Sequence, residues 1–194
     1  NTECQKMVER AKSYGCKDVG FILDRGYFSI ENIKYFEKHD YDYILMTKGN
    51  AAFITKSIEE SVALLKEGYQ YYMEDYELYG KTIEKELFHT GKKQYIHIYY
   101  DGIAAEREKI IINQRFHKLD QQLEEKKNQI IKRQEDVAGY KKYYRLKFDE
   151  NGYFQSYKRK DKEIKGLINR AGFFAIITSR KMSASQALEI YRDR

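Results

Sequence analysis

The chain has 194 residues, of which 42% are hydrophobic and 34% are charged. This size and balance fit one sizeable domain, or a domain that carries an insertion, with a large wetted surface. Two cysteines, Cys4 and Cys16, exclude a disulfide framework and favour a reducing, cytoplasmic location. No apolar run approaches the roughly 18 residues of a membrane span and no signal peptide is recognised, so no membrane partner is expected. The chain begins without Met and ends inside a helical pattern, which is typical of a fragment of a longer protein.

Helices and strands alternate in the first quarter of the chain. An amphipathic pattern predicts a helix over 2–14. Apolar runs predict strands over 19–24 and 41–47, with a helix over 29–38 between them. This alternation is typical of a sheet covered by helices, so the sequence predicts the α/β class.

A carboxylate stands where the first predicted strand ends. Asp24 follows the apolar run 21–23, Gly26 permits a tight turn, and Ser29 suits the N-cap of the next helix. Because α/β folds place catalytic and ligand-binding groups at the carboxyl ends of strands, Asp24 is a candidate site residue. The alternative is that Asp24 only closes the turn, which is the interpretation given to Asp101 at the end of a later strand.

The middle of the chain has a different pattern. Apolar residues predict strands over 83–89 and 95–100, and a long polar helix is predicted over 104–136, about 50 Å at 1.5 Å per residue. No function follows from the tyrosine-rich segment 69–79.

One narrow apolar stripe on the long helix favours a hairpin or coiled-coil partner over deep burial. The stripe consists of Ile112, Phe116, Leu119, Leu123 and Ile130.

Positive charge is concentrated between residues 141 and 170. This segment has ten Lys or Arg and four Asp or Glu, and its surplus of six equals the net charge of the whole chain. Strands over 143–148 and 153–157, joined by the turn 149–152, predict a basic hairpin. Its interleaved cations and aromatic rings suit a nucleic acid, although a solvated face with core-packed aromatics is an equal alternative. The candidate DNA-binding cations are Lys141, Lys142, Arg145, Lys147, Lys158, Arg159 and Lys160.

An apolar strand and a capped helix end the chain. The segment 172–179, GFFAIITS, predicts a buried strand. Ser183, with Gln186 three residues later, forms the capping-box pattern of a helix start. Tyr191 and Arg194 are three residues apart, so they lie on the same side of that helix.

Several familiar site patterns are missing. Gly80-Lys81-Thr82 matches the end of a phosphate-binding loop, but Asp75 stands where the loop needs glycine. The four histidines lack the i, i+3 or i, i+4 spacing of a zinc site. No Gly-x-Ser-x-Gly elbow occurs. These absences argue against nucleotide, zinc and serine-hydrolase sites.

Two blocks of the chain resemble one family of enzymes. The segment 23–29, LDRGYFS, together with Asn32, resembles the second-aspartate block of bacterial insertion-sequence DDE transposases. The segment 172–179, followed by the helix that ends in Tyr191-x-x-Arg194, resembles the block leading into the Tyr-x2-Arg-x3-Glu-x6-Lys signature of one large transposase group. The order of the blocks and the long lysine-rich stretch between them are also similar, so the resemblance spans essentially the whole chain.

The resemblance implies a fold and a function. The fold is a ribonuclease-H-like α/β core, residues 1–50 and 171–194, interrupted by a mixed α+β insertion, residues 51–170, that contains the long helix. The implied function is metal-dependent DNA cleavage and strand transfer at transposon ends. The partner is double-stranded DNA, and the protein would be a bacterial, nucleoid-associated enzyme that acts as a homodimer in its synaptic complex.

The resemblance also assigns roles to residues. Such chemistry uses two Mg²⁺ ions about 3.5–4 Å apart, held by carboxylates, to stabilise the entering and leaving oxygens. Asp24 is implied to be a metal ligand, and Tyr191 and Arg194 to contact DNA phosphates. Arg25 is expected to contact a phosphate or to pair with an acid, and the structural role is favoured. The family's other two carboxylates are expected before Asn1 and four residues after Arg194, so this chain alone is expected to be inactive.

Two other classes of function fit the residues. A non-catalytic nucleic-acid-binding protein would use the basic hairpin alone. A protein-interaction module would use the helix 104–136, with Leu119 and Leu123 mediating self-association. If the helix instead folds back within the insertion, the chain is expected to be monomeric.

Overall fold

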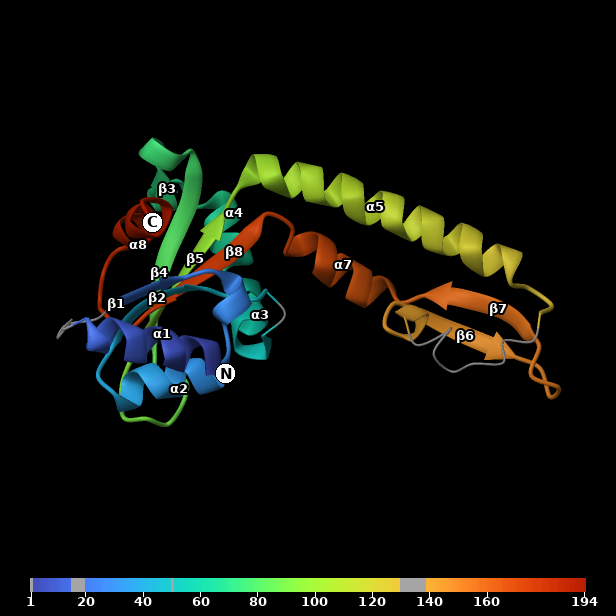
Figure 1. Cartoon of the computed structure of the whole chain (residues 1–194). Helices are drawn as coiled ribbons and strands as arrows, with labels where there is room; N and C mark the ends of the chain where they lie inside the picture. The colour runs from blue at the N-terminus through green and yellow to red at the C-terminus, as the bar shows by residue number, and fades with distance from the viewer. Residues whose placement is uncertain (1, 15–19, 50, 130–138) are drawn as a thin grey trace. The chain divides into compact units, whose positions relative to one another are not determined.

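A computed structural model describes residues 2–14, 20–49, 51–129 and 139–194 (Figure 1). The chain divides into two units. Unit 1 comprises residues 1–101 and 173–194, and unit 2 comprises residues 102–172. The chain therefore leaves unit 1 once, at the end of a strand, and returns to it at the start of another.

Unit 1 is built on a six-stranded sheet. Its strands lie in the order β1-β2-β8-β5-β4-β3, and the β1–β2 pair is parallel while every other pair is antiparallel. The fold is thus mixed α/β, as the sequence predicts, with a mostly antiparallel sheet. The strands are β1 (Gly20–Leu23), β2 (Asp42–Met46), β3 (Tyr72–Met73), β4 (Leu78–Lys85), β5 (Gln94–Tyr100) and β8 (Phe173–Thr178).

Helices cover both faces of this sheet. On one face Val8, Ile33 and Ile54 of the covering helices are buried against apolar side chains of β1, β2, β5 and β8. On the other face α8 packs through Ala184 and Leu188. The helices on the first face are α1 (Thr2–Ser13), α2 (Ile30–Lys38), α3 (Ala52–Glu59) and α4 (Val62–Glu67), and α8 spans Ala184–Arg192. Successive side chains of a strand point to opposite faces of the sheet, so alternate residues of each strand pack in the cores on the two faces.

Both predicted helix caps are confirmed. The Ser29 side chain accepts a hydrogen bond from the backbone N–H of Asn32 at the start of α2. Ser183 and Gln186 form the reciprocal capping box of α8. Such caps satisfy backbone donors that a helix start leaves without partners. The predicted start of the first strand at residue 19 lies outside the described residues.

Two predicted boundaries in the middle of the chain are wrong. The strand predicted over 83–89 is β4, which begins at Leu78, inside the tyrosine-rich segment, and ends at Lys85. Seven register pairs with β5 run from Tyr79 to Lys85, and Leu78 pairs with Met73 of β3. Because β4 and β5 extend the sheet of unit 1, the interrupting unit begins at Gly102 rather than at residue 51. Short 3-10 helices, η2 (Tyr69–Tyr71) and η3 (Glu74–Tyr76), form the rest of the tyrosine-rich segment around β3.

Unit 2 pairs a long helix with the predicted hairpin. Strands β6 (Tyr144–Phe148) and β7 (Phe154–Arg159) are antiparallel, which confirms the hairpin, and α7 spans Asp161–Asn169. The core of unit 2 consists of Phe116, Leu123, Tyr143, Tyr144 and Phe154, each at most 6% exposed.

The helix α5 spans Gly102–Glu125, so the prediction of a helix over 104–136 extends too far. Residues 130–136 of that prediction lie outside the described residues. The apolar stripe of α5 packs on the hairpin of its own chain, which is the fold-back alternative. Among the described residues no helix, α5 included, combines the length and apolar character needed to cross a membrane.

Candidate functional site

Asp24 lies directly after β1, on the face of the sheet that α8 covers. It precedes the 3-10 turn η1 (Arg25–Tyr27), in which the Tyr27 N–H donates to the Asp24 carbonyl at 3.0 Å. The side chain of Asn32, which is 3% exposed, donates to the Tyr27 carbonyl at 2.7 Å. The turn is thus fixed from both ends, and it holds the Asp24 carboxylate at a defined place.

The last turn of α8 reaches this carboxylate. Tyr191 is 5% exposed and packs with Leu188 against the sheet. Its hydroxyl donates to Oδ1 of Asp24 at 2.7 Å. The two residues are 167 positions apart in the chain, so only the packing of α8 across the sheet brings them together.

Arg194 completes the group. Its Nη2 donates to the same Oδ1 of Asp24 at 2.6 Å, and its Nη1 donates to the Tyr191 carbonyl at 2.6 Å. The guanidinium carbon lies 3.8 Å from the centre of the Tyr191 ring, a cation–π arrangement. The structure therefore brings three residues singled out from the sequence to one carboxylate oxygen.

These contacts stabilise the charged form of Asp24. The hydrogen bond from Tyr191 has the largest effect and lowers the pKa of Asp24. Burial opposes this effect, while the charge and the hydrogen bond of Arg194 and the charge of Arg25 add to the lowering. Burial, followed by the hydrogen bond to Asp24, raises the pKa of Tyr191. At neutral pH the group is therefore a carboxylate, a neutral phenol and a guanidinium.

The described residues do not fit a two-metal site at Asp24. Nowhere in the described ranges do three or more His, Cys, Asp or Glu side chains gather to hold a metal ion. Two Mg²⁺ ions need several carboxylates, and Arg194 donates to one oxygen of Asp24. No chemical step through a metal ion follows from this chain.

The candidate DNA-binding cations lie in unit 2, and they face in different directions. Arg145, Lys147 and Lys158 are exposed and belong to the outward side of the hairpin. Lys142 lies over the Tyr143 ring, with its Nζ 5.2 Å from the centre. Lys160 donates to the carbonyl of Lys141 at 2.6 Å. The strand register thus places three of the seven cations, Arg145, Lys147 and Lys158, on one side of the hairpin.

Arg159 faces the helix rather than the solvent side of the hairpin. It forms an ion pair with Asp120 of α5, and Asp120 also accepts a hydrogen bond from the Tyr144 hydroxyl at 2.7 Å. Asp120 was not among the residues predicted from the sequence. The available signal was its position four residues after Phe116, on the side of the helix that carries the apolar stripe.

Three of the interleaved aromatic residues, Tyr143, Tyr144 and Phe154, are core residues, whereas Phe148 and Tyr153 are exposed. Tyr144 and Phe154 are 1% and 0% exposed, and the Tyr143 ring meets Phe116 edge-on at 5.2 Å. Rings buried in this way cannot stack on nucleobases. For these residues the structure shows the core-packing alternative.

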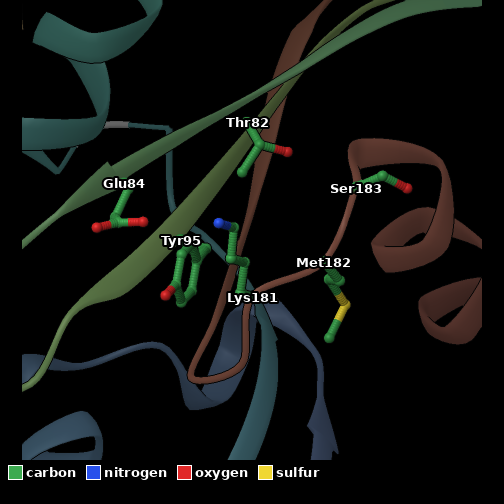
Figure 2. Close-up of a pocket in the computed structure, with 6 residues that line it drawn as sticks. All are labelled: Thr82, Glu84, Tyr95, Lys181, Met182 and Ser183. Atoms are coloured by element: carbon green, nitrogen blue, oxygen red, sulfur yellow. The ribbon is translucent and has the colours of Figure 1, made fainter.

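A separate hollow of about 460 Å³ lies beside the start of α8 (Figure 2). Its wall includes Thr82, whose Oγ1 lies 2.9 Å from Nδ1 of the fully buried His97. On the other side of the ring Nε2 lies 2.9 Å from Oγ1 of Thr178, which itself donates to the carbonyl of Arg180 at 2.8 Å. The residues lining the hollow are Thr82, Glu84, Tyr95, Lys181, Met182 and Ser183.

This pattern of donors argues against an activated hydroxyl. Because Thr178 uses its proton on Arg180, His97 must donate from Nε2 and accept the Thr82 proton at Nδ1. Burial lowers the pKa of His97 to about 4, so its imidazole is a weak base at neutral pH. The two threonines therefore satisfy the polar atoms of a buried ring, and the Thr82 hydroxyl is not activated as a nucleophile by His97.

Comparison with known proteins adds no identification. No protein-family model matches the chain, and no curated protein or solved structure matches it significantly.

Proposed function

We propose that this chain is part of a DDE transposase, an enzyme that cleaves and joins DNA at transposon ends. The observation that carries the proposal is the meeting of Asp24, Tyr191 and Arg194 at one oxygen atom. The two blocks of sequence that resemble the family contain these residues, and the resemblance alone did not require them to touch. Their contact supports a common site.

The arrangement of unit 1 is consistent with the proposal. The parallel pair β1–β2 joined through α2, with Asp24 at the end of β1, corresponds to the part of a ribonuclease-H-like core that the resemblance assigns to this chain. Unit 2 then corresponds to the insertion, entering after β5 and returning at β8. We infer that the core is partial and that the insertion is shorter than the sequence predicted.

Within this function the residues have different tasks. Asp24 supplies one ionised carboxylate for metal binding. Tyr191 and Arg194 act on it as positioning residues, because both donate to its Oδ1. Arg25 is exposed at the same turn, and its charge favours the ionised carboxylate. Two further carboxylates are required for Mg²⁺-dependent cleavage, and the described residues do not supply them.

The decisive experiment compares two strand-end aspartates in the full gene product. Asp24→Asn should abolish Mg²⁺-dependent nicking of a plasmid that carries the element's ends, while DNA binding persists. Asp101→Asn, at the end of β5, is the matched control and should retain nicking. Equal activity of Asp24→Asn and the unaltered protein would overturn the proposal.

The 194-residue chain gives a second test. It should not nick supercoiled plasmid with Mg²⁺ or Mn²⁺, because one carboxylate cannot assemble a metal pair. Nicking that Asp24→Ala removes would contradict this expectation.

A non-catalytic nucleic-acid-binding protein is the second candidate. The observation that favours it is the ion pair itself, since Arg194 already compensates the negative charge of Asp24 and donates to one of its oxygens. This candidate is supported if Asp24→Asn changes no property of the full gene product except stability.

A further inference from the structure

The outward face of the β6–β7 hairpin, defined here as Arg145, Lys147, Ser156 and Lys158, carries positive charge without compensation from its own strands. Arg145 stands directly opposite Lys158, and Lys147 stands opposite Ser156. All three cations are exposed. Neither β6 (YRLKF) nor β7 (FQSYKR) contains an acidic residue.

This arrangement costs stability in the free protein. Like charges directly opposite each other in an antiparallel pair repel. The nearest acid in sequence, Asp149, is engaged in the turn: its Oδ1 accepts from the N–H groups of Asn151 and Tyr153 at 3.0 and 2.8 Å, and its Oδ2 accepts from the Gln155 amide at 3.1 Å. An anionic partner on the outward face would remove the repulsion between Arg145 and Lys158.

The other face of the hairpin is already used. Tyr144 and Phe154 are buried against α5, and Arg159 is paired with Asp120. The four residues of the outward face include no aromatic ring, and the exposed rings Phe148 and Tyr153 lie beside the turn of the hairpin. Base stacking, which single-stranded binding normally uses, is therefore not available along this face. Two cations on one strand, two residues apart, are separated by about 7 Å along it, and a two-stranded ribbon fits the width of the DNA major groove. The chemistry therefore favours the phosphates of duplex DNA.

We propose that the outward face of the β6–β7 hairpin binds the phosphate backbone of duplex DNA. The proposal rests on the proposed function for the choice of DNA as partner, and it names the contact surface. Phosphate neutralisation by Lys and Arg is sequence-independent and releases counterions, so binding here should be strongly salt-dependent.

The test uses the 194-residue chain and a fluorescently labelled 30-base-pair duplex, with anisotropy measured between 50 and 200 mM salt. R145Q/K158Q should raise the Kd at 100 mM salt roughly tenfold or more, and should reduce the slope of log K against log salt by about 2. K162Q/K165Q, which removes the same charge from exposed positions of α7, is the matched control and should change Kd less than twofold.

Stability measurements keep the result interpretable. R145Q/K158Q should unfold in urea at the same or a higher concentration than the unaltered chain, because a like-charge pair has been removed. Equal loss of affinity in both double variants would overturn the proposal, since it would show only a diffuse charge effect. Tighter binding of a single strand than of the duplex would also overturn it, as would binding of an acidic protein surface in preference to DNA.

This proposal and the proposed function fail separately. Loss of duplex binding in R145Q/K158Q, with nicking indifferent to Asp24→Asn, would support the surface and reject the transposase. Nicking that depends on Asp24, with duplex binding unchanged in R145Q/K158Q, would support the transposase and reject the outward face as the DNA contact.

Discussion

Truncation of Leu123 distinguishes the two roles considered for the long helix. If the apolar stripe mediates self-association, Leu123→Ala should change the oligomeric state and leave the fold intact. In the structure Leu123 is 0% exposed and packs in the core of unit 2 with Phe116, Tyr144 and Phe154. We therefore expect Leu123→Ala to destabilise unit 2 and not to dissociate an oligomer.

The magnitude follows from complete burial. A fully buried Leu→Ala change typically costs 2–5 kcal/mol, through lost transfer free energy and the cavity that remains, so we expect about 3 kcal/mol for Leu123→Ala. Ile111→Ala is the matched control on the same helix. Ile111 is 62% exposed, and its truncation should change the free energy of unfolding by less than about 0.5 kcal/mol.

Urea unfolding measures the free energies, and amide hydrogen exchange of β6 and β7 shows whether the loss occurs in unit 2. Sedimentation or light scattering at high concentration measures the oligomeric state. The reasoning is refuted if Leu123→Ala converts an oligomer to a monomer while the exchange rates of the hairpin amides stay the same. It is also refuted if Ile111→Ala costs as much as Leu123→Ala.

Two further predictions concern titrating groups of unit 1. Tyr191→Phe removes the main cause of the lowered pKa of Asp24, so this pKa should rise toward its usual range in a carboxyl-carbon NMR titration; an unchanged titration would contradict the hydrogen bond. The pKa of His97 is about 4 in the folded chain and 6.5 when unperturbed, so the unfolded state binds the proton first as the pH falls. The contribution of neutral His97 to the free energy of unfolding should therefore be fully present above pH 6.5. At pH 5 the free energy of unfolding, measured with urea, should be lower by about 2 kcal/mol. His97→Gln should lack this part of the pH dependence, and the same pH dependence in that variant would show that other groups cause it.

The local features of the chain were predictable from the sequence. Ser29 and Ser183 cap the helices that follow them, because the hydroxyl and the backbone N–H that it accepts from are only three residues apart in the chain. The strands ending near Asp24 and beginning near Gly172, and the hairpin around the turn 149–152, were also predicted. Each depends on a short apolar run and a turn signal, both of which lie within a few residues.

The limits of the interrupting unit were not predictable. Strand β4 begins among tyrosines that carry no alternating pattern, and its length is set by pairing with β5. Pairing with β5 joins β4 to the sheet of unit 1, and the sequence of β4 alone did not indicate that residues 51–101 belong to this unit. The end of α5 at Glu125 likewise followed from no local stop signal.

At the candidate site the sequence by itself determined which residues are candidates, and the tertiary structure decided what they contact. Asp24 after an apolar strand, Tyr191 and Arg194 one helical turn apart, and a basic hairpin are all visible in the linear chain. That Asp24 accepts from both Tyr191 and Arg194, and that Arg159 faces Asp120 while Arg145 and Lys158 face outward, depends on the packing of α8 and of α5. The physical reason is the separation along the chain between the residues that interact. Caps and turns are decided by neighbours in sequence, whereas side-chain partners more than a hundred residues apart are decided only when the apolar faces of the elements are buried together.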